Sequence, residues 1–294
     1  EIYKEQKFDL MTVHEFPPFY NGIGARLLWQ KTKVPYVLEI FHVPGYPKPA
    51  NFKELIYKLL FKLFINFDAS KAKAVRVMNH ETGSFLQNNG VLKEKIVYIP
   101  AIYVDLEIFK PIGSVKEYDL IFVGRLEKNK GVDLLIEAVK ELRAWNSGLR
   151  TLVVGDGSLM QSAKRKVQIE KLEKNIIFYG WAEDQKKIAE LINKSKLLAM
   201  LSYNEGGPRV VIESMACGVP VLATPVGIVP DVTKSGESGE VVGWNSKDIS
   251  IKAQELLSDT EKYHKYSRAS LEIVKQFEKK GAIRNYAEKL RQLR

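Results

Sequence analysis

Two glutamates stand around a Gly-Gly-Pro corner in the segment SYNEGGPRVVIESMACGVPVLAT, residues 202–224. Glu205 precedes the corner, and Glu213 lies in a run that is typical of a helix beginning at Pro208 and ending before Gly218. Carboxylates accept hydrogen bonds from ligand hydroxyls, and paired glycines let a ligand approach the backbone closely. The alternative is a solvated charge pair in which the first carboxylate complements the helix dipole.

The spacing within this helix separates its apolar face from Glu213. At about 100° per residue, one face collects Val211, Ile212, Met215 and Ala216. Glu213 falls on the opposite, semi-polar side, together with Val210, Ser214 and Cys217. This pattern predicts that Glu213 does not belong to the most apolar stripe.

Two cations in IFVGRLEKNKGVDLLIEAV form a candidate anion site. A strand is expected to end at Gly124, and a helix is expected to begin near Gly131, with Arg125 and Lys130 between them. An arginine fork, a lysine and a helix N-terminus together suit a phosphate group. The Gly-Lys-Ser/Thr ending of a P-loop is missing, and a solvated basic turn is the alternative interpretation.

A second glycine turn, VVGDGSLMQ at residues 153–161, superficially resembles a dinucleotide loop. It lacks the third glycine and a suitably placed ribose-binding acid, which disfavours nicotinamide or flavin binding. Gly155 and Gly157 are therefore interpreted as shaping a tight strand-to-helix turn.

Short β-branched runs alternate with helical patterns along the chain, which favours an α/β fold with doubly wound parallel sheets. Four strands are expected before residue 116 and six after residue 119. We therefore predict a first, incomplete Rossmann-like domain over 1–116 and a second over 117–275. A C-terminal helix over 276–294 is expected to return to the first domain. Ligands would bind at the carboxyl ends of the strands.

Composition limits the classes of partner. The chain has 45 Lys/Arg against 35 Asp/Glu, a net charge of +10, and residues 1–116 hold 16 Lys/Arg against 11 Asp/Glu. No long arginine run or aromatic-interleaved basic motif appears, so a nucleic-acid partner is not expected. The single cysteine suits a reducing compartment, and no signal-peptide pattern begins the chain.

The segment NFKELIYKLLFKLFINF, residues 51–67, combines apolar side chains with Lys53, Lys58 and Lys62. One interpretation is a helix that covers the first sheet. The other is a peripheral contact with an anionic membrane, which basic amphipathic helices favour.

Taken in order, these motifs resemble the retaining glycosyltransferases of family 4, the glycogen-synthase and mannosyltransferase-like group with two facing Rossmann-like domains (the GT-B fold). The E-x7-E signature matches Glu205 and Glu213, and the Gly-Arg…Lys-Gly loop matches residues 124–131. VVGDGSL, FYGW and TPVGIVPDV match further turns of the family, and VLEIFHVPG matches a strand-end histidine segment. Two departures stand out. The family's first strand and glycine-rich turn have no counterpart before Glu1, and IPAIYVDLEIFKP replaces an Asn-Gly turn.

The resemblance implies a role for each matched residue. Arg125 and Lys130 would hold a nucleotide diphosphate, Glu213 would bind the ribose, and Glu205 would contact the donor sugar. His42 would point into the cleft as a second catalytic residue. The backbone around the corner would complete the donor site, through Gly206, Gly207, Pro208, Arg209 and Val210.

The implied reaction is transfer of a sugar from a nucleotide-diphosphate donor to a glycan or lipid-linked acceptor, with retention of anomeric configuration. No metal or other cofactor is expected, because the two cations neutralise the diphosphate. The location implied is cytoplasmic and peripheral on the inner face of the membrane. The alternatives are a sugar-nucleotide 2-epimerase and a non-catalytic sugar-nucleotide-binding protein.

Overall fold

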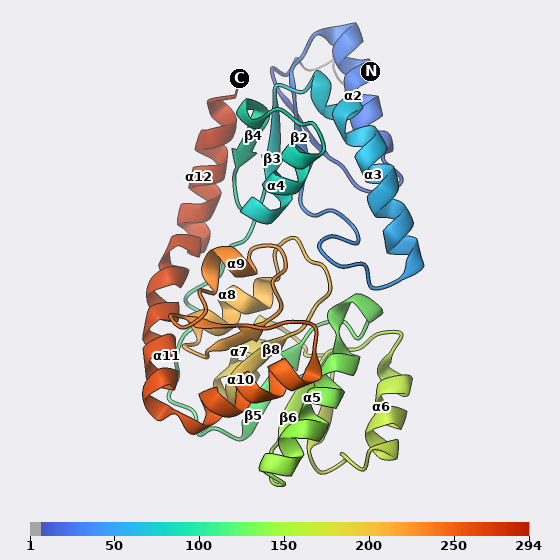
Figure 1. Cartoon of the computed structure of the whole chain (residues 1–294). Helices are drawn as coiled ribbons and strands as arrows, with labels where there is room; N and C mark the ends of the chain where they lie inside the picture. Colours follow the sequence, from blue (N-terminus) through green and yellow to red (C-terminus); the bar gives the residue numbers. More distant parts are fainter. Residues whose placement is uncertain (1–6, 294) are drawn as a thin grey trace. The chain divides into compact units, whose positions relative to one another are not determined.

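The computed structural model describes residues 7–293, which fall into two compact units (Figure 1). One unit comprises the residues up to Ile102, the short segment Asn204–Gly207 and the residues from Lys280 onward. The other comprises Tyr103–Tyr203 and Pro208–Lys279.

This division differs from the boundaries expected at residues 116 and 276. The backbone of Val104 accepts from the N–H of Lys279 at 3.0 Å and donates to the carbonyl of Phe277 at 2.9 Å. Lys116 donates to the carbonyls of Asn193 and Ser195. These contacts attach residues 103–116 to the second unit, although their Pro- and Gly-containing sequence is typical of a linker.

The first sheet is parallel, with strand order β1-β2-β3-β4. Its strands are β1 (Met11–His14), β2 (Tyr36–Ile40), β3 (Ala74–Val77) and β4 (Ile96–Tyr98). The crossover helices are α2 (Tyr20–Thr32), α3 (Phe52–Ser70) and α4 (His80–Asn88). Right-handed crossovers that always step in the same direction place all three helices on one face of the sheet. The buried side chains of this face, including Leu38, Phe61 and Phe85, form one apolar cluster.

The opposite face of the first sheet carries a buried ion pair. Glu39 on β2 and Arg76 on β3 are cross-strand neighbours, and their side chains lie 2.7 Å apart. The hydroxyl of Tyr286 also donates to Glu39, at 3.0 Å. Tyr286 belongs to α12 (Lys279–Arg291), whose Lys289 donates to the carbonyl of Tyr98 on β4. The C-terminal helix is therefore fixed to this face by polar contacts.

The second sheet is also parallel, with strand order β10-β9-β8-β5-β6-β7. Its strands are β5 (Tyr118–Val123), β6 (Thr151–Val154), β7 (Ile176–Gly180), β8 (Ser195–Met200), β9 (Val221–Ala223) and β10 (Gly239–Val241). All ten strands predicted from the sequence are thus present. The strand order reverses between β5 and β8, so the carboxyl ends of these two strands mark the switch point where ligands bind in such sheets.

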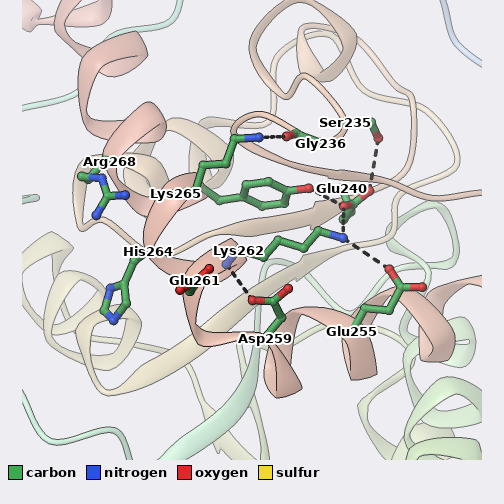
Figure 2. A pocket seen from close by; sticks show the side chains of 11 residues that line it. Ser235, Gly236, Glu240, Glu255, Asp259, Glu261, Lys262, His264, Lys265 and Arg268 are labelled. Atoms are coloured by element: carbon green, nitrogen blue, oxygen red, sulfur yellow. Dashed lines mark hydrogen bonds and ion pairs between the residues drawn. The ribbon is translucent and has the colours of Figure 1, made fainter.

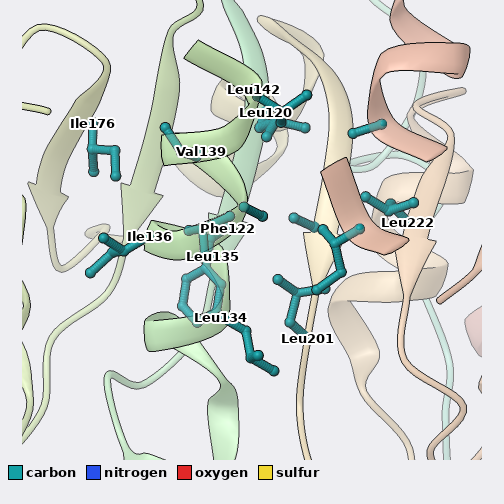
Figure 3. Close-up of a cluster of buried hydrophobic side chains, with 14 of the residues drawn as sticks. Leu120, Phe122, Leu134, Leu135, Ile136, Val139, Leu142, Ile176, Leu201 and Leu222 are labelled. Atoms are coloured by element: carbon teal, nitrogen blue, oxygen red, sulfur yellow. The ribbon is translucent and has the colours of Figure 1, made fainter. Parts of the chain in front are cut away.

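Helices cover both faces of the second sheet. The crossovers are α5 (Val132–Trp145), α6 (Met160–Ile169), α7 (Gln185–Asn193), α8 (Arg209–Ala216) and α9 (Val229–Val232), followed by α10 (Ser246–Ser258) and α11 (Thr260–Val274). The core beneath α5 is formed by Leu135, Val139 and Leu142 against Leu120 and Phe122 of β5 (Figure 3). This packing fixes the end of β5, where the candidate site begins.

A pair of buried carboxyl groups lies between α2 and α3 in the first unit. Glu15 and Asp68 are 2% and 1% exposed. The Glu15 carboxylate accepts hydrogen bonds from the N–H groups of Gly22 and Phe16, whereas neither carboxylate oxygen of Asp68 has a partner among the described residues. Burial, and then the charge of Glu15, raises the pKa of Asp68 to about 7.

We expect this pair to make the first unit less stable as the pH rises. Because the folded pKa of Asp68 exceeds its ordinary value of 3.8, the folded state binds more protons between pH 3.8 and about 7, and stability falls across that window. Amide hydrogen exchange in α2 and α3, corrected for intrinsic rates, should show faster opening at about pH 8 than at about pH 5. Asp68→Asn should reduce the difference without abolishing it, because burial raises the pKa of Glu15 as well. An unchanged pH dependence in that variant would contradict the assignment.

Candidate functional site

The candidate site starts at the carboxyl end of β5, where Gly124 and Arg125 leave the sheet. Arg125 is exposed, and its guanidinium forms no ion pair among the residues that the structure describes. The next residue, Leu126, is fully buried, and its N–H donates to the carbonyl of Asp156 at 2.9 Å. Glu127 accepts from the hydroxyl and the N–H of Ser158, which lowers the pKa of its carboxyl group. The two loops that follow β5 and β6 are therefore joined, with the guanidinium held outside.

The glycines of the loop after β6 are required by this close approach. Gly155 has φ +131°, and a Cβ there would collide with the carbonyl oxygen of Gly124. Gly157 has φ +159°, and its Cβ would lie 2.6 Å from the carbonyl oxygen of Leu126. The two glycines thus allow the loops after β5 and β6 to contact each other. This agrees with the tight strand-to-helix turn predicted for Gly155 and Gly157.

The second cation lies just before α5. Lys128–Lys130 form a single 3-10 turn, and Gly131 begins the helix in the left-handed conformation with φ +73°. A Cβ on Gly131 would collide with the carbonyl oxygen of Leu201, which follows β8. The loop is also joined to β8 by the N–H of Tyr203, which donates to the carbonyl of Asn129 at 2.8 Å. Lys130 therefore stands at the switch point, beside the N-terminus of a 14-residue helix.

A cavity of about 220 Å³ opens beside Arg125. It lies at the carboxyl ends of β5, β6 and β7, and its lining is mostly apolar. Its lining includes Val123, Gly124, Arg125, Gly155, Trp181 and Ile188. Trp181 is 71% exposed, so most of its indole is available to a ligand. Sequence reasoning gave no role to Trp181 or Ile188, although the glycine before the tryptophan in FYGW marked the end of a strand.

Glu213 is buried in α8, although it lies on the semi-polar side that it was expected to share with Ser214 and Cys217. Only 8% of the residue is exposed, and Ser214 and Cys217 on the same side are buried as well. The reason is that α8 contacts β8, β9, α7 and α11, so every residue of the helix after Val210 is buried. Burial raises the pKa of Glu213, although Arg209 opposes the shift. Glu213 is therefore not a solvated charge.

Arg209 is the partner of Glu213. Its guanidinium lies 3.6 Å from the Glu213 carboxylate and 5.6 Å from the centroid of the Tyr103 ring. Pro208 caps α8 with φ −67°. The N–H of Val211 donates to the carbonyl of Pro208 at 3.1 Å. The N–H groups of Arg209 and Val210 remain at the helix start, where no intrahelical acceptor exists.

The remaining expected site residues belong to the first unit. Gly206 lies against the end of β2, because a Cβ built on it would be 3.0 Å from the Cβ of His42 and would collide with the carbonyl of Phe41. The side chain of Asn79 donates to the carbonyl of Gly206 at 2.6 Å. Gly207 packs against Ile102 and Met78. The structure thus brings His42 next to the segment that carries Glu205.

A larger hollow of about 990 Å³ lies elsewhere on the second unit, over β10 and α11 (Figure 2). Its one buried carboxylate, Glu240, is fully engaged by the hydroxyl of Tyr266 at 2.6 Å and the ammonium of Lys262 at 3.0 Å. Burial lowers the pKa of Lys262, but the bond to Glu240 outweighs it and the net shift is upward. These groups join β10 to α11. The hollow contains none of the strand-end motifs that the sequence singled out, so it is not the candidate site.

The fold and the site together define a class. Two Rossmann-like units with parallel sheets, cationic turns at the strand ends and an adjacent apolar cavity are the architecture of GT-B glycosyltransferases. Residues 105–272 match the family described as "Glycosyl transferases group 1". The chain belongs to this family, which confirms the recognition made from the motifs.

Curated relatives support the same conclusion. N-acetyl-alpha-D-glucosaminyl L-malate synthase of Bacillus anthracis is 30% identical over 176 residues, which are 59% of this chain and 45% of that protein. The UDP-Gal:alpha-D-GlcNAc-diphosphoundecaprenol alpha-1,3-galactosyltransferase of Escherichia coli is 26% identical over 88% of this chain and 68% of that protein. The chain thus spans about half the length of the first of these relatives and about two thirds of the second.

A solved structure shows the same fold. HepE of Anabaena, determined in complex with UDP and glucose, aligns with a TM-score of 0.81 at 18% sequence identity. The alignment covers 99% of this chain and 80% of HepE. At this identity the likeness establishes the fold and not the ligand.

Proposed function

We propose that this chain transfers a sugar from a nucleotide-diphosphate donor to an acceptor with retention of anomeric configuration. The observation that carries the proposal is the cavity of about 220 Å³ beside Arg125, at the carboxyl ends of β5, β6 and β7. Its apolar wall and the exposed indole of Trp181 suit a flat nucleobase. The adjacent arginine and the lysine before α5 suit the diphosphate.

In this proposal the two cations also act on the reaction. Arg125 and Lys130 stabilise the negative charge that develops on the leaving diphosphate. Because these side chains neutralise the phosphates, the reaction would need no metal or other cofactor. Glu213 accepts hydrogen bonds from the ribose hydroxyls, and the N–H groups of Arg209 and Val210 complete the donor site.

We assign the sugar end of the donor to the Glu205 segment. Glu205 would contact donor-sugar hydroxyls, and His42, which neighbours Gly206 at the end of β2, would act on the same sugar. The backbone of Gly206 and Gly207 allows close approach by the ligand. An oxocarbenium-like transition state on one face of the sugar would account for retention.

The acceptor proposed is a glycan or a lipid-linked sugar. The E. coli relative is named as an enzyme that uses a UDP-galactose donor and a diphosphoundecaprenol-linked acceptor. By analogy we propose that this chain works in the cytoplasm, at the inner face of the membrane. None of the described helices is long and apolar enough to cross a bilayer.

If these roles are right, substitutions of the two glutamates should have different effects on ligand binding. Glu213→Gln should weaken binding of both the free nucleotide diphosphate and the intact donor, by about 1–3 kcal/mol, because both carry the ribose. Glu205→Gln should leave nucleotide-diphosphate affinity nearly unchanged and reduce discrimination among donor sugars and turnover. Calorimetry with UDP, GDP and ADP, each with and without a sugar, measures both effects in the whole chain.

Product analysis distinguishes the proposal from its alternatives. A transferase gives a glycosylated acceptor and a free nucleotide diphosphate, and nuclear magnetic resonance of the new linkage reports whether its anomeric configuration is retained. A 2-epimerised sugar, or tight binding without any turnover, would contradict it. Equal binding of nucleotide diphosphate by the parent and both glutamine variants would contradict the roles assigned to the carboxylates.

A further inference from the structure

Helix α3 of the first unit has two apolar faces. One is buried against the sheet through Phe61, Ile65 and Ala69. The other, which we call the outer stripe, is exposed to solvent and consists of Phe52, Ile56, Leu59, Leu60, Leu63 and Phe67. At about 100° per residue these six positions fall within roughly 100° of arc, on the side of the helix away from the buried face. The sequence interpretation of a helix that covers the sheet accounts for one face only.

Single hydrophobic side chains on a protein surface are common, but the outer stripe is a contiguous group of six exposed ones, and such a patch marks an interaction site. Leu63 is 72% exposed, Phe52 is 74% exposed and Leu59 is 54% exposed. Aromatic rings stand at both ends of the stripe, and branched aliphatic side chains fill its middle. A continuous apolar strip four turns long is the surface that a helix lying in a membrane interface presents to lipid.

Charge identifies the kind of surface that fits the stripe. Residues 1–102 contain 14 Lys/Arg against 9 Asp/Glu. Three of those nine acids do not contribute surface charge, since Glu15 and Asp68 are buried together and Glu39 is paired with Arg76. Arg76 is neutralised by the same pair, which leaves 13 Lys/Arg against 6 Asp/Glu in this part of the sequence. This positive balance favours an anionic partner.

Two of the three lysines on α3 are exposed and can contact an anionic surface. Lys53 and Lys62 are exposed. Lys58 instead donates to the carbonyl of Pro47 at 3.5 Å, and its ammonium lies 5.1 Å from the centroid of the Tyr46 ring. Lys58 is only half exposed, so the prediction made for all three lysines is tested on the two exposed ones, Lys53 and Lys62.

We propose that the outer stripe of α3 docks this protein on an anionic lipid bilayer, with Lys53 and Lys62 at the headgroups and Leu59 and Leu63 inserted among the acyl chains. A second copy of the chain fits less well, because a two-fold contact would bring two positively charged surfaces together. The inference deepens the proposed peripheral location and is independent of the nucleotide site, whose residues lie on other elements.

Co-sedimentation with vesicles of phosphatidylcholine and phosphatidylglycerol tests the inference on the whole chain. Leu59→Ser/Leu63→Ser should reduce the bound fraction at equal lipid by at least about tenfold, because it removes two inserted side chains. Lys53→Gln/Lys62→Gln should reduce binding at low salt and remove most of its dependence on salt. Vesicles of phosphatidylcholine alone should bind the parent much more weakly.

Matched controls come from the second unit. The exposed fraction of Ile169 is 69%, similar to the 72% of Leu63. Ile169→Ser therefore removes a comparable exposed apolar side chain from the second unit. Lys164→Gln/Lys186→Gln lowers the net charge by the same amount as the α3 lysine variant. Both controls should bind vesicles like the parent. All variants should bind UDP, GDP or ADP with the same calorimetric affinity as the parent. A loss of vesicle binding can therefore be distinguished from a loss of the proposed nucleotide site.

Two results would overturn the proposal. One is parental vesicle binding by the leucine variant. The other is a parent that does not bind vesicles but is dimeric by light scattering, with the dimer dissociated by Leu59→Ser/Leu63→Ser. The stripe would then be an interface between two copies of the chain.

Discussion

Arg125→Ala and Lys130→Ala should each weaken binding of the nucleotide diphosphate by about 1.5–3 kcal/mol, or about 10- to 150-fold in Kd, while nucleoside binding changes little. Each change removes a charge-assisted contact to a phosphate and leaves the apolar cavity intact. Matched calorimetric titrations, for example with UDP and uridine, measure the difference. Turnover should fall further than affinity, because the same cations would stabilise the leaving diphosphate.

Lys128→Ala is the control for this experiment. Lys128 is exposed in the same 3-10 turn and carries the same charge, but it has no role in the proposed site. It should bind the nucleotide diphosphate almost like the parent. Equal losses for the nucleoside and the nucleotide diphosphate in the Arg125 and Lys130 variants would show that the two cations form only a solvated basic turn.

Arg76→Met should be among the most destabilising single substitutions in the first unit, at about 3–5 kcal/mol. Arg76 is 3% exposed and Glu39 7% exposed. Among the described residues, the variant leaves the buried carboxylate of Glu39 with the Tyr286 hydroxyl as its one side-chain partner. The Arg76 Nε also loses its bond to the carbonyl of Ile99. Hydrogen exchange in β2 and β3 should report the loss directly, and thermal unfolding should begin at a lower temperature.

A double variant separates the unpaired charge from the lost packing. Arg76→Met/Glu39→Gln removes both charges and should recover a substantial part of the stability, because the buried carboxylate is no longer uncompensated. Lys187→Met, which breaks the exposed pair with Glu190, should change stability little. A single Arg76→Met variant as stable as the double variant would mean that the pair is not effectively buried.

The amino-acid sequence determined the elements and the class of this protein. Each of the ten expected strands is present, because short β-branched runs bounded by Gly, Pro and Asn leave few other local conformations. Their alternation with helical patterns is sufficient to predict parallel sheets covered on both faces. The ordered glycine, arginine and lysine motifs at strand ends led to the family, since loops at the carboxyl ends of strands carry the chemistry of this fold.

The burial of Glu213 and the two apolar faces of α3 were decided only by tertiary structure. A helical pattern shows which residues share a face, but not whether a second layer covers the opposite face. For α8 such a layer exists and Glu213 is buried, whereas for α3 the outer stripe remains exposed. The cavity beside Arg125 is formed by the ends of three strands, and Glu39, Arg76 and Tyr286 meet across large sequence separations. Local periodicity contains no information on such contacts, because they depend on how the strands are ordered in the sheet.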